Sequence, residues 1–69
     1  MRNQVKAARS ALMITQSELA DKLSVSRQTI HSIESGKYVP STVLALKLAV
    51  VLQQTVEALF QLDEEDQVQ

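Results

Sequence analysis

The spacing of apolar residues along the chain predicts five short helices. Apolar side chains recur at intervals of three and four residues, whereas no stretch alternates between apolar and polar residues as a half-buried strand would. The helices are expected over residues 3–11, 16–23, 27–35, 42–52 and 56–61. The predicted fold class is therefore all-α.

Residues that favour helix ends separate these segments. Thr15 stands three residues before Glu18, which is the spacing of a capping box. Other hydroxyl residues directly precede a predicted helix and are expected to cap it: Ser26, Ser41 and Thr55. Gly36 follows the third helix, where a left-handed residue commonly ends a helix.

The composition limits both the domain organisation and the chemistry. The 69 residues include no cysteine and one histidine, so we expect no disulfide, no metal and no cofactor. The most apolar stretch, residues 42–52, is too short to cross a bilayer, and no apolar signal segment follows the N-terminus. We expect one cytoplasmic domain over residues 1–62, without membrane contact, and an acidic, flexible tail over residues 63–69.

The charges are distributed unevenly along the chain. Residues 1–47 contain all seven Lys and Arg residues and three of the eight acidic residues, while residues 48–69 contain the other five. A basic body of this kind is compatible with binding a polyanion through one face. The net charge of −1 gives no support for such binding by itself.

The third predicted helix has an unusual outer face. Ile30 and Ile33 point in nearly one direction, and short polar side chains lie opposite them: Gln28, His31, Ser32 and Ser35. Amides and hydroxyls of this kind can pair with base edges in DNA. A plain solvent-exposed face is the alternative, and His31 is either close to DNA or simply exposed.

Two helices of about eight residues joined by a three-residue turn form a helix-turn-helix arrangement. The segment that contains them, TQSELADKLSVSRQTIHSIESGKYVPS, resembles the helix-turn-helix of the Cro and phage-repressor class of regulators, the XRE-like family. The resemblance continues through ALKLAVVL and TVEALF and covers residues 4–62. It implies a five-helix Cro/repressor-like DNA-binding domain.

The resemblance also implies roles for individual residues. Those expected to read bases, or to lie beside them, are Arg27, Gln28, Thr29, Ser32 and His31. Those expected at phosphates are Gln16, Ser26, Ser35, Lys37 and Tyr38. Arg9 and Glu34 are expected to form a structural ion pair. Two alternatives stay open, since the Arg27 guanidinium can bind guanine or a phosphate and Tyr38 can be a packing residue.

The fourth helix is apolar almost all round, and one core cannot bury every side of it. The surplus is expected to form an exposed patch and a homodimer interface: Val43, Val50, Val51, Leu59 and Leu62. Ser24 and Gln53 stand where the family usually has glycine after a helix, so a positive φ there would be strained.

The sequence therefore predicts a sequence-specific, double-stranded-DNA-binding transcriptional regulator, a repressor that reads an inverted-repeat operator as a homodimer. No nucleophile–base pair, glycine-rich phosphate loop or metal cluster is present in the sequence, so no enzymatic step is expected. The alternative is a protein-interaction module, antitoxin-like or bridging, whose acidic tail or fourth helix binds a protein partner and for which DNA binding is secondary or absent.

Overall fold

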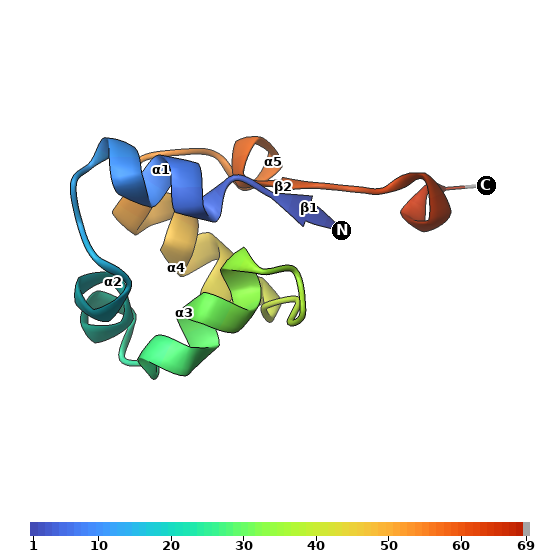
Figure 1. The fold of residues 1–69 in the computed structure, drawn as a ribbon. Helices are drawn as coiled ribbons and strands as arrows, with labels where there is room; N and C mark the ends of the chain where they lie inside the picture. The colour runs from blue at the N-terminus through green and yellow to red at the C-terminus, as the bar shows by residue number, and fades with distance from the viewer. Residues whose placement is uncertain (69) are drawn as a thin grey trace.

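The computed structural model describes residues 1–68, and short helices make up most of them (Figure 1). In chain order the elements are β1 (Arg2–Asn3), α1 (Val5–Ala11), α2 (Gln16–Leu23), α3 (Arg27–Glu34), α4 (Thr42–Leu52), α5 (Val56–Leu59), β2 (Phe60–Gln61) and a 3-10 turn, η1 (Glu64–Asp66). The five predicted helices are all present, and the all-α fold class is confirmed. Both α2 and α4 have the predicted bounds.

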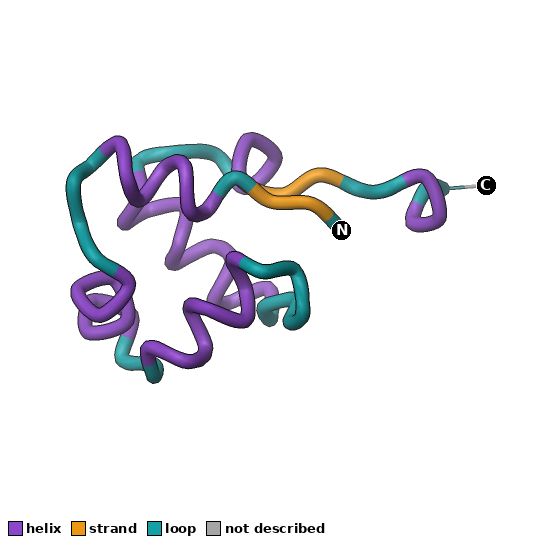
Figure 2. The backbone as a smooth tube through the Cα atoms, viewed as in Figure 1, coloured by secondary structure: helices purple, strands orange, loops and turns teal. Residues whose placement is uncertain are grey.

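The main difference from the prediction is a small antiparallel pair of strands (Figure 2). Arg2 pairs with Gln61 and Asn3 with Phe60, so the two ends of the helical body lie side by side. The expectation that the chain has no strand was wrong. Because these residues are extended, α1 begins at Val5 rather than residue 3, and α5 ends at Leu59 rather than residue 61.

The predicted N-caps are confirmed. The Thr15 hydroxyl accepts from the Glu18 amide at 3.0 Å, and the Glu18 carboxylate accepts from the Thr15 amide at 2.8 Å. The three other predicted caps each accept a hydrogen bond from the backbone amide three residues on: Ser26, Ser41 and Thr55. These bonds use amides that would otherwise lack a partner in the first turn, and they fix where each helix starts.

One apolar core joins all five helices. Its buried members are Val5, Leu19, Ala20, Leu23, Ile30, Ile33, Leu48, Ala49, Leu52 and Leu59. Ile30 and Ile33 anchor the inner side of α3 to the other helices, and both are fully buried. The outer side of α3 is therefore turned away from the core.

Three helices are followed by a left-handed residue other than glycine. Met13, two residues after α1, has φ of 58°, Ser24 follows α2 with φ of 56°, and Gln53 follows α4 with φ of 58°. All three lie in the left-handed region, which costs an L-residue about 1–2 kcal/mol. Gly36, with φ of 81°, occupies the same region after α3 without that penalty.

The exposed side of α4 corrects the predicted interface. Leu59 is fully buried, so it belongs to the core and not to a surface patch. Val51 is half-buried and packs against the core. Three apolar side chains of α4 are exposed, and we call them the α4 stripe: Val43, Leu46 and Val50, at 63, 54 and 78 %. Leu46 was not among the residues predicted for the interface. Leu62 is 46 % exposed.

The predicted tail leaves the helical body directly after β2 (Figure 1). The N-terminal ammonium of Met1 lies 2.6 Å from Asp63 Oδ2 and 3.2 Å from Asp66 Oδ2, and Arg2 Nε lies 3.3 Å from Asp63 Oδ1. Gln69, the last residue of this predicted segment, lies outside the described residues, and the flexibility of the tail stays a prediction. Among residues 1–68, no helix is long and apolar enough to span a membrane.

Candidate DNA-binding interface

The outer face of α3 is polar and accessible. Arg27, Gln28 and His31 are exposed, while Thr29 and Ser32 are half-buried. A hollow of about 270 Å³ lies on this face, lined by Gln28, Thr29, Ser32 and Tyr38. The structure therefore brings three of the predicted base-reading residues together with Tyr38, one of the predicted phosphate contacts.

Hydrogen bonds at the start of α3 limit what its hydroxyl groups can do. Ser26 Oγ accepts from the Thr29 amide at 3.1 Å and lies 2.9 Å from Thr29 Oγ1, where either oxygen can be the donor. Only one of these two hydroxyl protons is used in their shared hydrogen bond. The other proton is free to be donated to a base or a phosphate.

A polar network behind α3 ties it to α1 and α2. Arg9 Nε donates to Glu34 Oε2 at 2.7 Å and Arg9 Nη2 donates to Glu34 Oε1 at 3.2 Å, so the predicted ion pair is present. Arg9 Nη1 also donates to the Ile14 carbonyl at 2.8 Å, and Gln16 Nε2 donates to Glu34 Oε1 at 3.0 Å. The last turn of α3 is thus held by the end of α1 and by the first residue of α2.

Two opposing effects act on Glu34. Burial disfavours its charged form, but the hydrogen bonds from Arg9 and Gln16 outweigh burial and hold the pKa of the carboxyl below its usual value. The same pair raises the pKa of Arg9, because its hydrogen bond to Glu34 favours the guanidinium form. The network is therefore ionised at neutral pH.

A second, wider hollow of about 740 Å³ lies where α2 and α3 begin. Arg9, Gln16, Ser17 and Arg27 are among its lining residues. Donors from α1, α2 and α3 thus converge where an anion can approach the first turn of α2. The Gln16 amide is already bonded to Glu34, so only its second N–H is left for a phosphate. Ser17 was not predicted, although a hydroxyl in the first turn of α2 was a visible signal.

Residues 5–59 match a helix-turn-helix family model. The chain belongs to the XRE-like helix-turn-helix family of transcriptional regulators. It is 41 % identical over 66 residues to the uncharacterized HTH-type transcriptional regulator YgzD of Bacillus subtilis, a match that covers 96 % of this chain and 100 % of the relative. An uncharacterized HTH-type transcriptional regulator of Archaeoglobus fulgidus is 44 % identical, with 96 % and 93 % covered. Another, from Methanocaldococcus jannaschii, is 48 % identical, with 87 % and 91 % covered.

This helix-turn-helix regulator is thus a DNA-binding protein, and α2 and α3 are its two defining helices. In such motifs the second helix lies in the major groove while the first crosses the backbone. We therefore call α3 the recognition helix. Its exposed polar face is the surface that this docking geometry turns toward base edges.

The recognition helix ends in a loop folded around one carbonyl. The Ser32 carbonyl accepts from the backbone amides of Lys37 and Tyr38 at 3.0 and 3.2 Å, and from the Ser35 hydroxyl at 3.1 Å. Both Lys37 and Tyr38 are exposed beside the helix as a result. Ser35 uses its only hydroxyl proton on the Ser32 carbonyl, so a phosphate must compete with that carbonyl for the proton.

Asn3 makes a second tie to the recognition helix that the sequence did not reveal. Its Nδ2 donates to the Ile33 carbonyl at 2.8 Å, while its Oδ1 accepts from the Val5 amide at 3.1 Å. One side chain therefore joins β1, the start of α1 and the last turn of the recognition helix. The sequence placed Asn3 inside the first helix, and its partner 30 residues away could not be read from the sequence.

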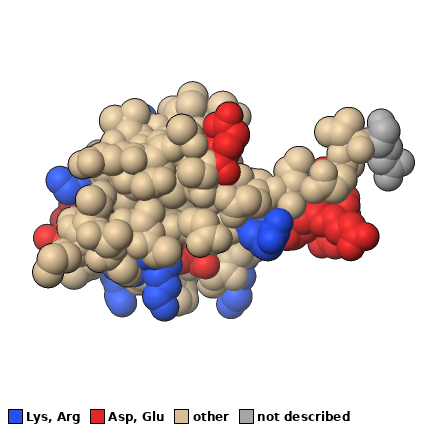
Figure 3. Space-filling model, turned by 90° about the horizontal axis from the view of Figure 1, so that it is seen from above, with Lys and Arg blue, Asp and Glu red and all other residues tan. Residues whose placement is uncertain are grey.

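Figure 3 shows how charge is distributed over one view of the molecule. Most of the Lys and Arg side chains visible there lie along one edge of the body, whereas the largest group of acidic side chains lies in the tail.

Among residues 1–68, no three His, Cys, Asp or Glu side chains are grouped to hold a metal ion.

Proposed function

We propose that this regulator is a repressor that binds an inverted-repeat operator as a homodimer. The observation that carries the proposal is the outer face of the recognition helix, which is polar, accessible and fixed from behind by Arg9, Gln16 and Asn3. A rigid helix with short polar side chains suits base reading, because the amide of Gln28 can form two bonds with adenine. Occupancy of a promoter then blocks polymerase.

The proposed contacts follow the family's docking geometry. Those assigned to bases, or to the groove beside them, are Arg27, Gln28, Thr29, Ser32 and His31. Those assigned to phosphates are Gln16, Ser26, Lys37 and Tyr38, with Ser17 added from its place in the wide hollow. Ser35 stays in the phosphate set, where a phosphate competes with the Ser32 carbonyl for its hydroxyl proton.

A homodimer is proposed because one recognition helix reads only a few base pairs, which gives little specificity in a genome. Two copies related by a twofold axis would place their recognition helices about 34 Å apart, in successive major-groove segments. The α4 stripe supports this assembly, since three apolar side chains of one helix are 54 to 78 % exposed. Leu62 extends the apolar surface from the other end of the chain.

The test is selection from a random DNA duplex library, which presumes no operator. The wild-type protein is expected to retain an inverted repeat with half-sites one helical turn apart. The Arg27→Glu variant is the control and is expected to retain nothing enriched. Recovery of a single half-site would contradict the dimer, and recovery of no enriched sequence would contradict specific DNA reading.

The exposed α4 stripe also favours one other candidate, a protein-interaction module in which DNA binding is secondary. The Arg27→Glu variant separates the two functions in cells that carry the gene. Loss of regulation with this variant supports the repressor. If regulation survives the charge reversal, the interaction module is the better account.

A further inference from the structure

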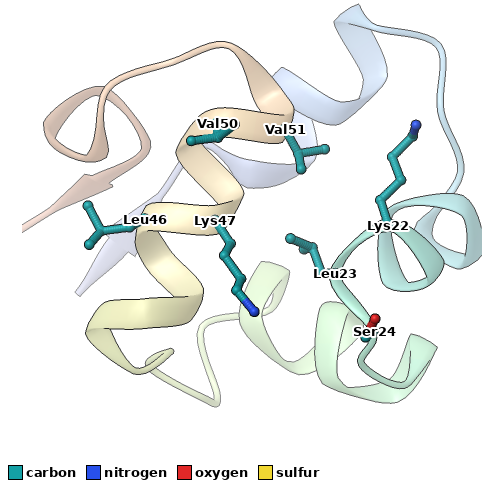
Figure 4. Close-up of a pocket in the computed structure, with 7 residues that line it drawn as sticks. All are labelled: Lys22, Leu23, Ser24, Leu46, Lys47, Val50 and Val51. Carbon is teal, nitrogen blue, oxygen red and sulfur yellow. The ribbon is translucent and has the colours of Figure 1, made fainter.

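A groove of about 340 Å³ lies between the end of α2 and the outer side of α4 (Figure 4). Its α4 wall is apolar and is made by Leu46, Val50 and Val51. Two exposed lysines, Lys22 of α2 and Lys47 of α4, also line it, and their ammonium groups lie on different sides of it in Figure 4. Among residues 1–68, no carboxylate forms a salt bridge with either lysine, although Lys22 acts through space on Glu18 one turn earlier. The groove therefore suits a segment that combines apolar and acidic side chains.

This chain contains such a segment directly after β2. Leu62 and Val68 are 46 and 91 % exposed, and four acidic residues stand between them. Asp63 and Asp66 already bind the N-terminal ammonium. Glu64 and Glu65 are exposed, and no cation pairs with either of them within residues 1–68. Two carboxylates and two flanking apolar side chains thus match two ammonium groups and an apolar wall.

The tail lies far from the groove of its own chain. In Figure 1 the tail runs away from β2 at one end of the molecule, whereas α2, which forms one wall of the groove, lies at the opposite end. The contacts of Asp63 and Asp66 with Met1 and Arg2 hold the base of the tail in that direction. The tail of a second copy of the chain can therefore occupy the groove that the tail of the same chain does not reach in this structure.

We propose that the groove between α2 and α4 binds the acidic tail of a second copy of this chain. Each copy gives its tail and receives that of its partner, so the exchange closes as a symmetric pair. Glu64 and Glu65 then lie near Lys22 and Lys47, and the apolar side chains of the tail cover Val50 and its neighbours. This inference rests on the homodimer of the proposed function and names the contact that completes it.

A charge exchange between two variants tests the contact. The groove variant is Lys22→Glu with Lys47→Glu, and the tail variant is Glu64→Lys with Glu65→Lys. Each variant alone places like charges together, so its dimer dissociation constant should rise about tenfold at low salt, and less at high salt. An equimolar mixture pairs each groove with a tail of opposite charge and should recover the wild-type constant. Sedimentation of the DNA-free proteins gives these constants, and circular dichroism checks that each variant is folded.

Matched controls carry the same change in net charge elsewhere on the surface. They are Lys6→Glu with Lys37→Glu, and Asp21→Lys with Glu57→Lys. If these controls weaken the dimer as much, or if the mixture regains nothing, the contact is absent and the inference is wrong. If the groove variant and the tail variant both dimerise as tightly as the wild type, while Val43→Asp dissociates the dimer, the tail contact alone is overturned. A wild-type protein that stays monomeric at every concentration overturns the proposed homodimer and the tail contact together.

Discussion

Arg9 and Glu34 face each other edge to edge, with Arg9 Nε 2.7 Å from Glu34 Oε2 and Nη2 3.2 Å from Oε1. The two side chains are only 12 and 4 % exposed, so water screens them little. This bidentate pair joins α1 to the last turn of the recognition helix. The orientation of the polar outer face of the recognition helix is therefore set by a polar contact behind it as well as by the apolar core.

Removing one member of this pair should destabilise the protein strongly. Arg9→Met leaves the Glu34 carboxylate buried without its main partner, and we expect the free energy of unfolding to fall by about 3 kcal/mol. Urea unfolding measures this change. Lys6→Met removes an exposed cation of the same helix that acts on Glu34 only through space, so it is the control and should lower stability far less. Additive effects of Arg9→Met and Glu34→Gln in the double variant would show that the two residues are not coupled.

The lowered pKa of Glu34 predicts a specific dependence of stability on pH. The folded-state pKa lies below the reference value of 4.5, so the stabilisation is present in full above about pH 4.5 and is lost as the pH falls through the lower folded value. We expect the stability difference between wild type and Glu34→Gln to shrink over that acidic range. Unfolding curves from about pH 7 to about pH 3 measure it. A difference that is constant across that range would contradict the assignment.

Glycine at position 53, the left-handed position after α4, should raise the stability of the protein. Gln53→Gly removes the strain of φ at 58°, against which stands the greater freedom of glycine in the unfolded chain. The net gain should be about 0.5–1 kcal/mol, seen as a rise of a few degrees in Tm. Ser35→Gly is the comparison, because Ser35 has φ of −81° and should lose stability both from the freedom of glycine and from the lost hydroxyl bond to the Ser32 carbonyl. A loss of stability in Gln53→Gly would mean that φ at Gln53 is not strained.

Local signals in the sequence were sufficient to predict most of the fold. Each N-cap hydroxyl acts on an amide three residues away, so Thr15 and Ser26 could be recognised without knowing the fold. Periodicity likewise gave the bounds of α2 and the inward direction of Ile30 and Ile33. These features depend on neighbours within one or two turns of helix, which the sequence displays directly.

The features that sequence did not reveal depend on distant partners or on short elements. The pair of strands has two residues on each side, too few to show a period. In α4, apolar residues occupy almost every side, so no pattern separated buried Leu48 from exposed Leu46. Leu59 was assigned to the surface because α5, with four residues, has no clear face. Within the candidate site, the polar outer face of α3 was predictable, whereas the bond from Asn3 to Ile33 was not.

The α4 stripe predicts that one apolar side chain controls dimerisation. Leu46→Asp places a charge in the middle of the proposed interface, and the dimer dissociation constant should rise about tenfold or more. The monomer should remain folded, because Leu46 is already 54 % exposed. Met13→Asp is the control, since Met13 is 90 % exposed on the turn between α1 and α2. Sedimentation equilibrium measures both, and an unchanged constant for Leu46→Asp would place the interface elsewhere.

Substitution of a base-reading residue and of a phosphate-binding residue should lower DNA affinity in different ways. The two losses should differ in how they depend on DNA sequence and on salt concentration. Gln28→Ala should relax the preference at one operator position by about 1–3 kcal/mol, while Lys37→Ala should weaken binding to all duplexes alike and lower the salt slope by about one unit. Titrations with the selected operator, single-base variants of it and a random duplex, each at several salt concentrations, separate the two patterns. Gln54→Ala, in the exposed turn between α4 and α5, is the control and should change neither quantity. If Gln28→Ala and Lys37→Ala both weaken every duplex equally, then Gln28 binds the backbone and the base contacts lie further along the recognition helix, at Ser32 or His31.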